Sequence, residues 1–198
     1  MNPRWIIAMS LVSMGCVTQV APVAEVVGPR EGLIVGRVLA AITGETGRKY
    51  EPAIRSLELE HQESHERVTI QIESDDRQFS IALSPGAYRL NRVHISEGPF
   101  MSMADVGVAF SVSREAATYV GTWRFGIDSP RYGRMLTLSM VMDQDDRSRA
   151  DVFLSERYPT RPEIPVTAAL PEPSAVEARL YEVMPYPRYP RYFRRHNW

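Results

Sequence analysis

Apolar and polar residues alternate along most of the chain between Leu33 and Asp143. Strict alternation places one face of a strand on a core and turns the other toward solvent. With shorter apolar runs added, the pattern predicts about seven to eight strands, over residues 33–39, 54–60, 66–73, 77–83, 87–95, 106–112, 119–125 and 136–142. Turn sequences such as Ser84-Pro85-Gly86 separate them, with little helix between. The pattern therefore predicts a mainly β domain, an antiparallel β-sandwich rather than an alternating α/β sheet.

One helix is expected after these strands, from Asp146 to Tyr158. Its apolar residues recur at helical spacing, acids stand at its start, and Pro159 ends it. From Pro159 onward the chain is rich in proline and lacks periodic apolar positions, except for a short candidate helix at 174–183. This composition predicts an extended, Pro-rich tail over residues 159–198.

The amino end has the layout of an export signal. Arg4 and the amino group provide a positive start, about eight apolar residues follow, and small residues precede Cys16. No stretch of the chain reaches the roughly 18 to 20 apolar residues of a spanning helix. Residues 16–32 contain Pro22, Gly28 and Pro29 without any period, which predicts a flexible tether.

The residues Ser13-Met14-Gly15-Cys16 resemble the lipobox of bacterial lipoproteins, with Ser13 where the family usually has Leu. The resemblance implies that signal peptide 1–15 is removed and that Cys16, the only cysteine, is acylated. Several acyl chains would hold the protein lastingly at a membrane. In this family Val17, which is not Asp, favours the outer membrane if the cell is Gram-negative. An ordinary cleaved signal and a structural amino terminus are the alternatives.

A second resemblance concerns the segment Leu83–Leu90. Its Pro85, Gly86 and Tyr88 are similar to a hairpin of carboxypeptidase-regulatory-like and transthyretin-like modules, and Val35-Gly36-Arg37-Val38 is similar to their early Gly-x-Val strand. The resemblance implies a β-sandwich domain over residues 33–158. Such modules commonly bind or support other proteins or glycans and lack catalysis. Function does not follow from such a fold.

Composition narrows the function further. The chain has 198 residues, with 23 Lys and Arg against 24 Asp and Glu, so it lacks the positive field typical of nucleic-acid binders. One cysteine forms neither an internal disulfide nor a cysteine-built metal site. No nucleophile motif is recognisable, and we expect no cofactor and no enzymatic activity.

Two histidines are the candidates for a metal site. His61 and His65 are four residues apart among Glu60, Glu63 and Glu66, a spacing that would place both imidazoles on one face of a helix. They lie between two predicted strands, however, which favours a solvated turn. A metal-dependent enzyme using His61 and His65 is therefore an alternative to the leading interpretation.

Tyrosine, proline and arginine recur every three residues near the carboxyl end, the period of a polyproline II helix. This basic and aromatic segment suits sugar rings or anionic cell-wall polymers, or it is an unstructured tail. Export disfavours nucleic acid as its partner. The candidate binding residues are Tyr186, Arg188, Tyr189, Arg191, Tyr192, Arg194 and Arg195.

These features favour a lipid-anchored cell-envelope protein with a non-catalytic β-sandwich used for structural support or protein interaction. A glycan or peptidoglycan-binding module using the carboxyl segment is the alternative from a second class. The expected partners are the membrane, through Cys16, and envelope proteins or peptidoglycan.

Overall fold

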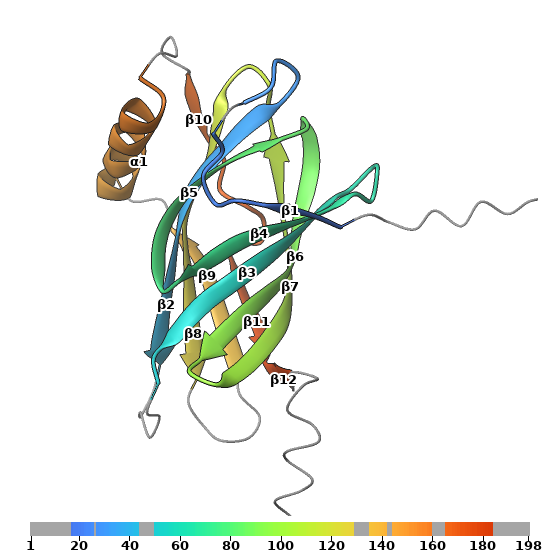
Figure 1. Ribbon diagram of the computed structural model, residues 1–198, viewed down its shortest axis with the longest axis vertical. Helices are drawn as coiled ribbons and strands as arrows, with labels where there is room; N and C mark the ends of the chain where they lie inside the picture. The colour runs from blue at the N-terminus through green and yellow to red at the C-terminus, as the bar shows by residue number, and fades with distance from the viewer. Residues whose placement is uncertain are drawn as a thin grey trace, which may run out of the picture.

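The computed structural model describes residues 17–25, 27–43, 50–128, 135–141, 144–159 and 165–183. These residues form two β-sheets and one helix, α1 (Gln144–Arg157) (Figure 1). Sheet A contains, in order across it, β1 (Val17–Val20), β4 (Arg67–Ser74), β3 (Pro52–His61), β6 (Gly86–Glu97), β7 (Phe100–Val112) and β12 (Tyr181–Val183). Sheet B contains β11 (Ala175–Arg179), β9 (Met135–Val141), β8 (Ala117–Asp128), β2 (Gly32–Thr43) and β5 (Asp76–Leu83), and β10 (Val166–Ala168) also pairs with β8.

The mainly β prediction is confirmed, and each strand expected from alternation is present as one of β2 to β9. The burial of β4 shows why the pattern was informative, because Val68, Ile70 and Ile72 are buried while Arg67 and Glu73 are exposed. The strand count was too low, since the described residues contain twelve strands. The additional ones, β1, β10, β11 and β12, contain only three to five residues each, too few for alternation to reveal them.

The strands are not all antiparallel, which corrects the prediction. β2 pairs in parallel with β8, and the pairs β1–β4 and β8–β10 are parallel as well. Alternation specifies which face of a strand is buried, but it carries no information on the direction of the neighbouring strand. The parallel pair β2–β8 joins segments about eighty residues apart, so no hairpin turn constrains it.

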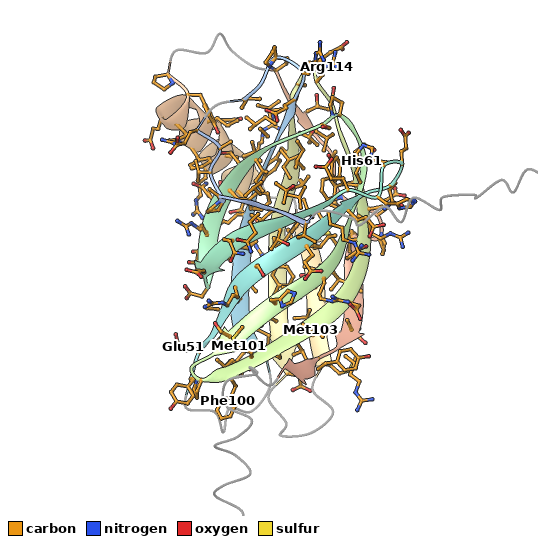
Figure 2. The ribbon with its side chains drawn as sticks, turned by 45° about the vertical axis from the view of Figure 1, so that its right-hand side comes forward. Glu51, His61, Phe100, Met101, Met103 and Arg114 are labelled. Atoms are coloured by element: carbon orange, nitrogen blue, oxygen red, sulfur yellow. The ribbon has the colours of Figure 1, made fainter. Side chains whose placement is uncertain are left out.

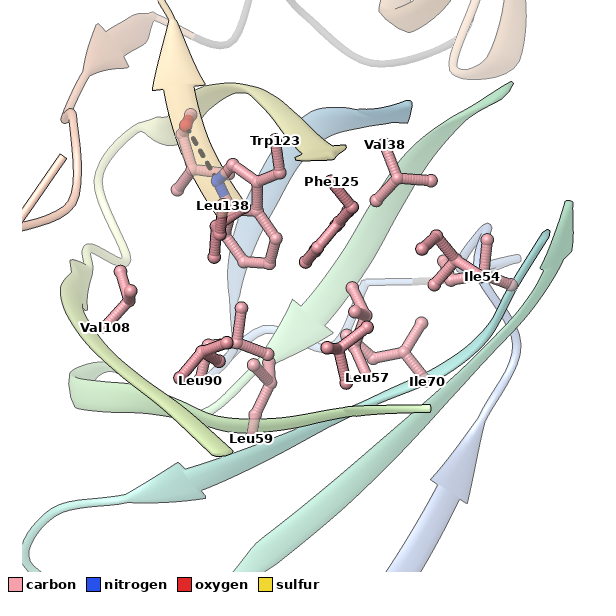
Figure 3. Packing of buried hydrophobic residues seen from close by; sticks show 14 of the residues in the cluster. Val38, Ile54, Leu57, Leu59, Ile70, Leu90, Val108, Trp123, Phe125 and Leu138 are labelled. Atoms are coloured by element: carbon pink, nitrogen blue, oxygen red, sulfur yellow. Dashed lines mark hydrogen bonds between the residues drawn. The ribbon is translucent and has the colours of Figure 1, made fainter. Parts of the chain in front are cut away.

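The main hydrophobic core lies between the two sheets. Figure 3 shows side chains from sheet A (Ile54, Leu57, Leu59, Ile70, Leu90 and Val108) meeting side chains from sheet B (Val38, Trp123, Phe125 and Leu138). Trp123 is fully buried, and its ring lies 5.5 Å from that of Phe79 and 5.9 Å from that of Phe110, between centroids. Its indole N–H donates to the carbonyl of Val120 at 3.1 Å. Trp123 thus links both sheets through aromatic contacts.

A second, smaller cluster holds α1 against the outer face of sheet B. Leu33 and Val35 of β2 and Ala117 and Tyr119 of β8 are buried together with Ala150 of the helix. The prediction of a helix over 146–158 is confirmed for residues 146–157, and the helix begins two residues earlier, at Gln144. Both faces of β2 and β8 are therefore covered, which explains the continuous burial of Gly32–Gly36. No helix among the described residues has the length and apolar character needed to cross a membrane.

The expected tether is wrong for residues 17–24. Val17–Val20 add β1 to sheet A beside β4. Pro22 and Ala24 then exchange backbone hydrogen bonds with Ser80 of β5, at 2.9 and 2.7 Å, so the segment crosses from sheet A to sheet B. The unpaired backbone groups of the sheet edges supply partners that the sequence of this segment does not reveal.

The expected extended tail is wrong for residues 166–183, and the candidate helix at 174–183 is replaced by two strands that belong to different sheets. β11 pairs with β9 in sheet B, and β12 pairs with β7 in sheet A. Ala178 and Leu180 are buried between the two pairings while Glu177 and Arg179 are exposed, a period of two that outweighs the helical propensity of Ala, Glu and Arg. The chain thus passes from one sheet to the other at Leu180, and residues 184–198 lie outside the described part.

Candidate functional site

The first strand described, β1, begins at the residue that follows Cys16. Cys16 itself is outside the described residues, but Val17, the next residue, begins β1 and is paired with Arg67 at the start of β4. Val17, the residue after Cys16, is therefore fixed next to the turn that joins β3 and β4.

The side chain of His61 holds the β3–β4 turn in place through hydrogen bonds. Its ring is buried, and Nδ1 accepts hydrogen bonds from the backbone N–H groups of Glu63 and Ser64, at 3.3 and 3.1 Å. The proton of the neutral ring therefore lies on Nε2, which donates to the carbonyl of Pro85 at 3.4 Å. The backbone N–H of Gln62 donates to the carbonyl of Ala87 at 2.8 Å. His61 thus joins the β3–β4 turn to the turn between β5 and β6.

His65 takes a different position from His61. Its side chain is 76% exposed, and its Nδ1 lies 3.1 Å from Oε1 of Glu60. That contact, with those from Asn91 and Arg67, lowers the pKa of the Glu60 carboxyl below its ordinary value, although burial opposes the shift. The two imidazoles that were the alternative candidates for metal ligands are engaged separately, one by backbone amides and the other by a carboxylate. No group of three or more possible ligands occurs among the residues that the structure describes.

Gly86 makes room for His61 and gives the first testable prediction. Its φ is +146°, and a Cβ added there would lie 2.3 Å from Nε2 of the buried ring. We expect Gly86→Ala to lower the free energy of unfolding by about 2–4 kcal/mol, because backbone strain and displacement of His61 act together.

Gly107 provides the matched control, because its φ is +68° but nothing lies within 4 Å of an added Cβ. Gly107→Ala should lower the free energy of unfolding by only about 1–2 kcal/mol, the cost of the backbone conformation alone. Urea denaturation of both variants measures the difference. Equal losses would show that the close contact with His61 has no energetic consequence.

Tyr88, beside His61, gives a prediction for alkaline pH. The ring of Tyr88 meets His61 edge-on at 4.9 Å and stacks on Phe110 at 6.0 Å, between centroids. Burial, with smaller contributions from Glu66 and Glu31, raises the pKa of the Tyr88 hydroxyl from 10.0 to about 12. The unfolded chain releases this proton first, so the stabilisation is complete below pH 10 and is lost as pH rises toward about 12.

Between these pH values the wild type should lose up to about 1.4 kcal/mol of unfolding free energy per pH unit from this group. Tyr88→Phe lacks the ionisable hydroxyl, so its stability should fall less steeply over the same range. Parallel slopes in denaturant titrations of the two proteins between pH 9 and 11.5 would contradict the assignment.

The outer face of sheet A carries a row of paired charges. Oε1 of Glu58 accepts from Nε2 of His94 at 2.6 Å, and Oε2 lies 3.5 Å from Nη1 of Arg92. Nε of Arg92 also donates to Asp105 at 2.8 Å, and this bond is the main reason that the pKa of Arg92 is raised. Each charge has an opposite partner on a neighbouring strand, so the row stabilises the register of β3, β6 and β7.

Apolar side chains gather at the end of sheet A opposite the His61 turn. Figure 2 shows Phe100, Met101 and Met103 together there, with Glu51 nearby and His61 far above. Phe100 is 53% exposed, and its ring lies 6.4 Å from that of Tyr50, between centroids. Tyr181 of β12, directly opposite Met103, is 48% exposed. Aromatic and methionine side chains are enriched in protein interfaces.

A buried carboxylate joins α1 to sheet B. Asp146, in the first turn of the helix, is 8% exposed. Its carboxylate accepts from the hydroxyl of Thr122 at 2.8 Å and from Nη1 of Arg37 at 3.3 Å, and it lies 3.6 Å from Nη1 of Arg149. Arg37 donates two further bonds to Asp76, at 2.6 and 2.7 Å, which lower the pKa of the Asp76 carboxyl.

An open groove of about 580 Å³ lies beside this network. Arg37, Asp76, Gln78, Arg149, Val152 and Glu156 line it with others from α1. Because Arg37 is already paired with two carboxylates, we interpret the charged residues as the means by which the helix docks. The sequence pattern indicates that Asp146 is an acid at a helix start, but it does not predict the bonds from Arg37 and Thr122, because these residues are distant in the chain.

The tail residues predicted to bind glycan, from Tyr186 to Arg195, lie outside the described part of the chain. Of the predicted site residues the structure therefore places only His61 and His65. The chain matches no protein-family model, no curated protein and no solved structure.

Proposed function

We propose that this chain is a lipid-anchored protein of the bacterial cell envelope, held at the membrane through Cys16, with a non-catalytic β domain used for structural support or protein interaction. The observation that carries the proposal is the junction at Cys16. The residues that resemble a lipobox end at Cys16, and β1, the first strand of sheet A along the chain, begins at the next residue, Val17. Acylation there would attach a folded domain to the membrane, and the location would be the outer membrane in a Gram-negative cell.

The finer fold assignment belongs to the same proposal. We assign the two sheets to a β-sandwich of the carboxypeptidase-regulatory-like or transthyretin-like type. In its support, Pro85 and Gly86 lie at the turn between β5 and β6, and Tyr88 and Leu90 are buried in the core. Gly36 of β2 also allows close packing, because a Cβ there would lie 2.7 Å from Cζ of Phe79.

The role in interaction is supported by the apolar end of sheet A. Phe100, Tyr50, Tyr181 and two methionines form a surface of the composition that protein interfaces use. Elsewhere on the outer face, the charges of Glu58, Arg92 and Asp105 are paired with one another.

Metabolic labelling with a clickable fatty acid tests the anchor. We expect the wild type to carry the label and Cys16→Ser to carry none, because the thiol is the acceptor. Ser13→Leu is the matched control, since it restores the residue usual in the lipobox and should keep the label. A wild-type protein that is exported but unlabelled would overturn the proposal.

A further inference from the structure

We propose that the end of sheet A formed by β1 and the β3–β4 turn lies directly against the lipid headgroups. This inference rests on the proposed acylation of Cys16 and adds the orientation of the domain. Figure 1 shows β1 alongside β4, and the register places Val17 beside Arg67, the first residue after the turn. The turn itself comprises residues 62–66, all exposed.

The number of residues between Cys16 and the first strand limits the distance between the domain and the membrane. A flexible segment over residues 17–32 would allow a separation of about 55 Å when fully extended. In the structure the sheet begins at Val17, so a single peptide link of about 3.8 Å joins the anchored residue to the fold. Four paired positions from Val17 to Val20 fix β1 to β4, and the bridge between Val23 and Ser80 fixes the segment to sheet B.

The surface around Val17 is compatible with contact to lipid headgroups, but it does not form a membrane-binding site by itself. Val17 is 58% exposed and apolar, and Arg67 beside it is exposed and able to meet a phosphate. Glu63 and Glu66 of the same turn are exposed as well and offset that positive charge. The anchor, rather than the field of the domain, therefore holds this end at the membrane, and the unacylated protein should not bind vesicles.

The opposite end of sheet A must then point away from the bilayer. β3 runs ten residues from Pro52 to His61, a length of about 33 Å. Figure 2 shows Glu51 and Phe100 at one end and His61 toward the other. Labels at the two ends of β3 thus report on the orientation of the domain.

Fluorescence quenching in vesicles tests this orientation. Cys16 is the only cysteine, so after acylation an introduced cysteine is the only free thiol available for labelling. Gln62→Cys places a fluorophore in the β3–β4 turn, and Glu51→Cys, also at an exposed residue, is the matched control at the far end. The full acylated chains are reconstituted into phosphatidylethanolamine and phosphatidylglycerol vesicles that carry a nitroxide quencher on some headgroups.

We expect the label at position 62 to lose most of its fluorescence and the label at position 51 to lose little. Inserting about twelve Gly and Ser residues between Cys16 and Val17, with a mean span of about 20 Å, should remove most of the quenching at position 62. Equal quenching at both positions in an acylated protein would overturn the orientation alone. Absence of the acyl group would overturn the anchor and, with it, this inference.

Discussion

Replacing Trp123 by alanine is expected to lower the free energy of unfolding by about 3–5 kcal/mol, the largest loss from any single side chain of this core. The indole is fully buried and contacts Phe79 of sheet B and Phe110 of sheet A. Its removal would leave a cavity where the two sheets meet, and it would free the carbonyl of Val120 from its hydrogen bond. Urea denaturation followed by far-ultraviolet circular dichroism measures the change.

Two further variants make this prediction specific. Trp123→Phe keeps most of the aromatic contact and should lose only about 1–2 kcal/mol, which remains measurable if Trp123→Ala does not fold. Phe100→Ala removes an exposed ring at the end of sheet A and should change stability by about 0.5 kcal/mol or less. If Trp123→Phe and Phe100→Ala destabilise equally, the interior position of Trp123 is wrong.

Replacing Asp146 by alanine should lower the free energy of unfolding by about 2–4 kcal/mol. The carboxylate is buried and accepts from Thr122 and Arg37, so its loss leaves a buried hydroxyl and a guanidinium without one of their acceptors. The effect stays below the upper range for a broken buried pair, because Arg37 retains both bonds to Asp76. Asp146→Asn keeps an acceptor for Thr122 and should lose about half as much.

The location of the effect distinguishes helix docking from general destabilisation. Amide hydrogen exchange in Asp146→Ala should increase in α1 more than in β3 or β6, since Asp146 is the contact between the helix and the charges of sheet B. Arg55→Ala is the matched control, because Arg55 pairs at 3.5 Å with Glu73 and both are exposed. That variant should lose less than about 1 kcal/mol. Uniform exchange throughout Asp146→Ala would argue against a docking role.

Alternation predicted the strands because their burial is one-sided. Ile70 and Ile72 lie in the core while Gln71 between them does not, and the same signal located the other strands of the central sheets. It failed where the strand is short and its burial is slight. β1 has no buried side chain, and its position depends on hydrogen bonds to β4, which sequence periodicity does not encode.

The relative direction of neighbouring strands and the long-range polar contacts also could not be predicted from the sequence. The parallel pairing of β2 with β8 is decided by the tertiary fold. The pattern of buried and exposed positions in each segment is compatible with a parallel or an antiparallel neighbour. Arg37 and Thr122, which donate hydrogen bonds to Asp146, are 109 and 24 residues away from it along the chain, so no local pattern joins them to it. At the candidate site, the expected solvated turn is correct for His65 but wrong for His61, which is the last residue of β3 and is buried with its ring bonded to backbone amides.

The mass of the amino-terminal peptide is the most direct test of the central claim, that Cys16 anchors the protein to a membrane. The protein is extracted from membranes with detergent, digested and analysed by mass spectrometry. We predict a peptide that begins at Cys16 and carries a diacylglyceryl group on its sulfur. A peptide that contains unmodified Cys16, either behind an intact signal or as a free thiol after cleavage, would contradict the account.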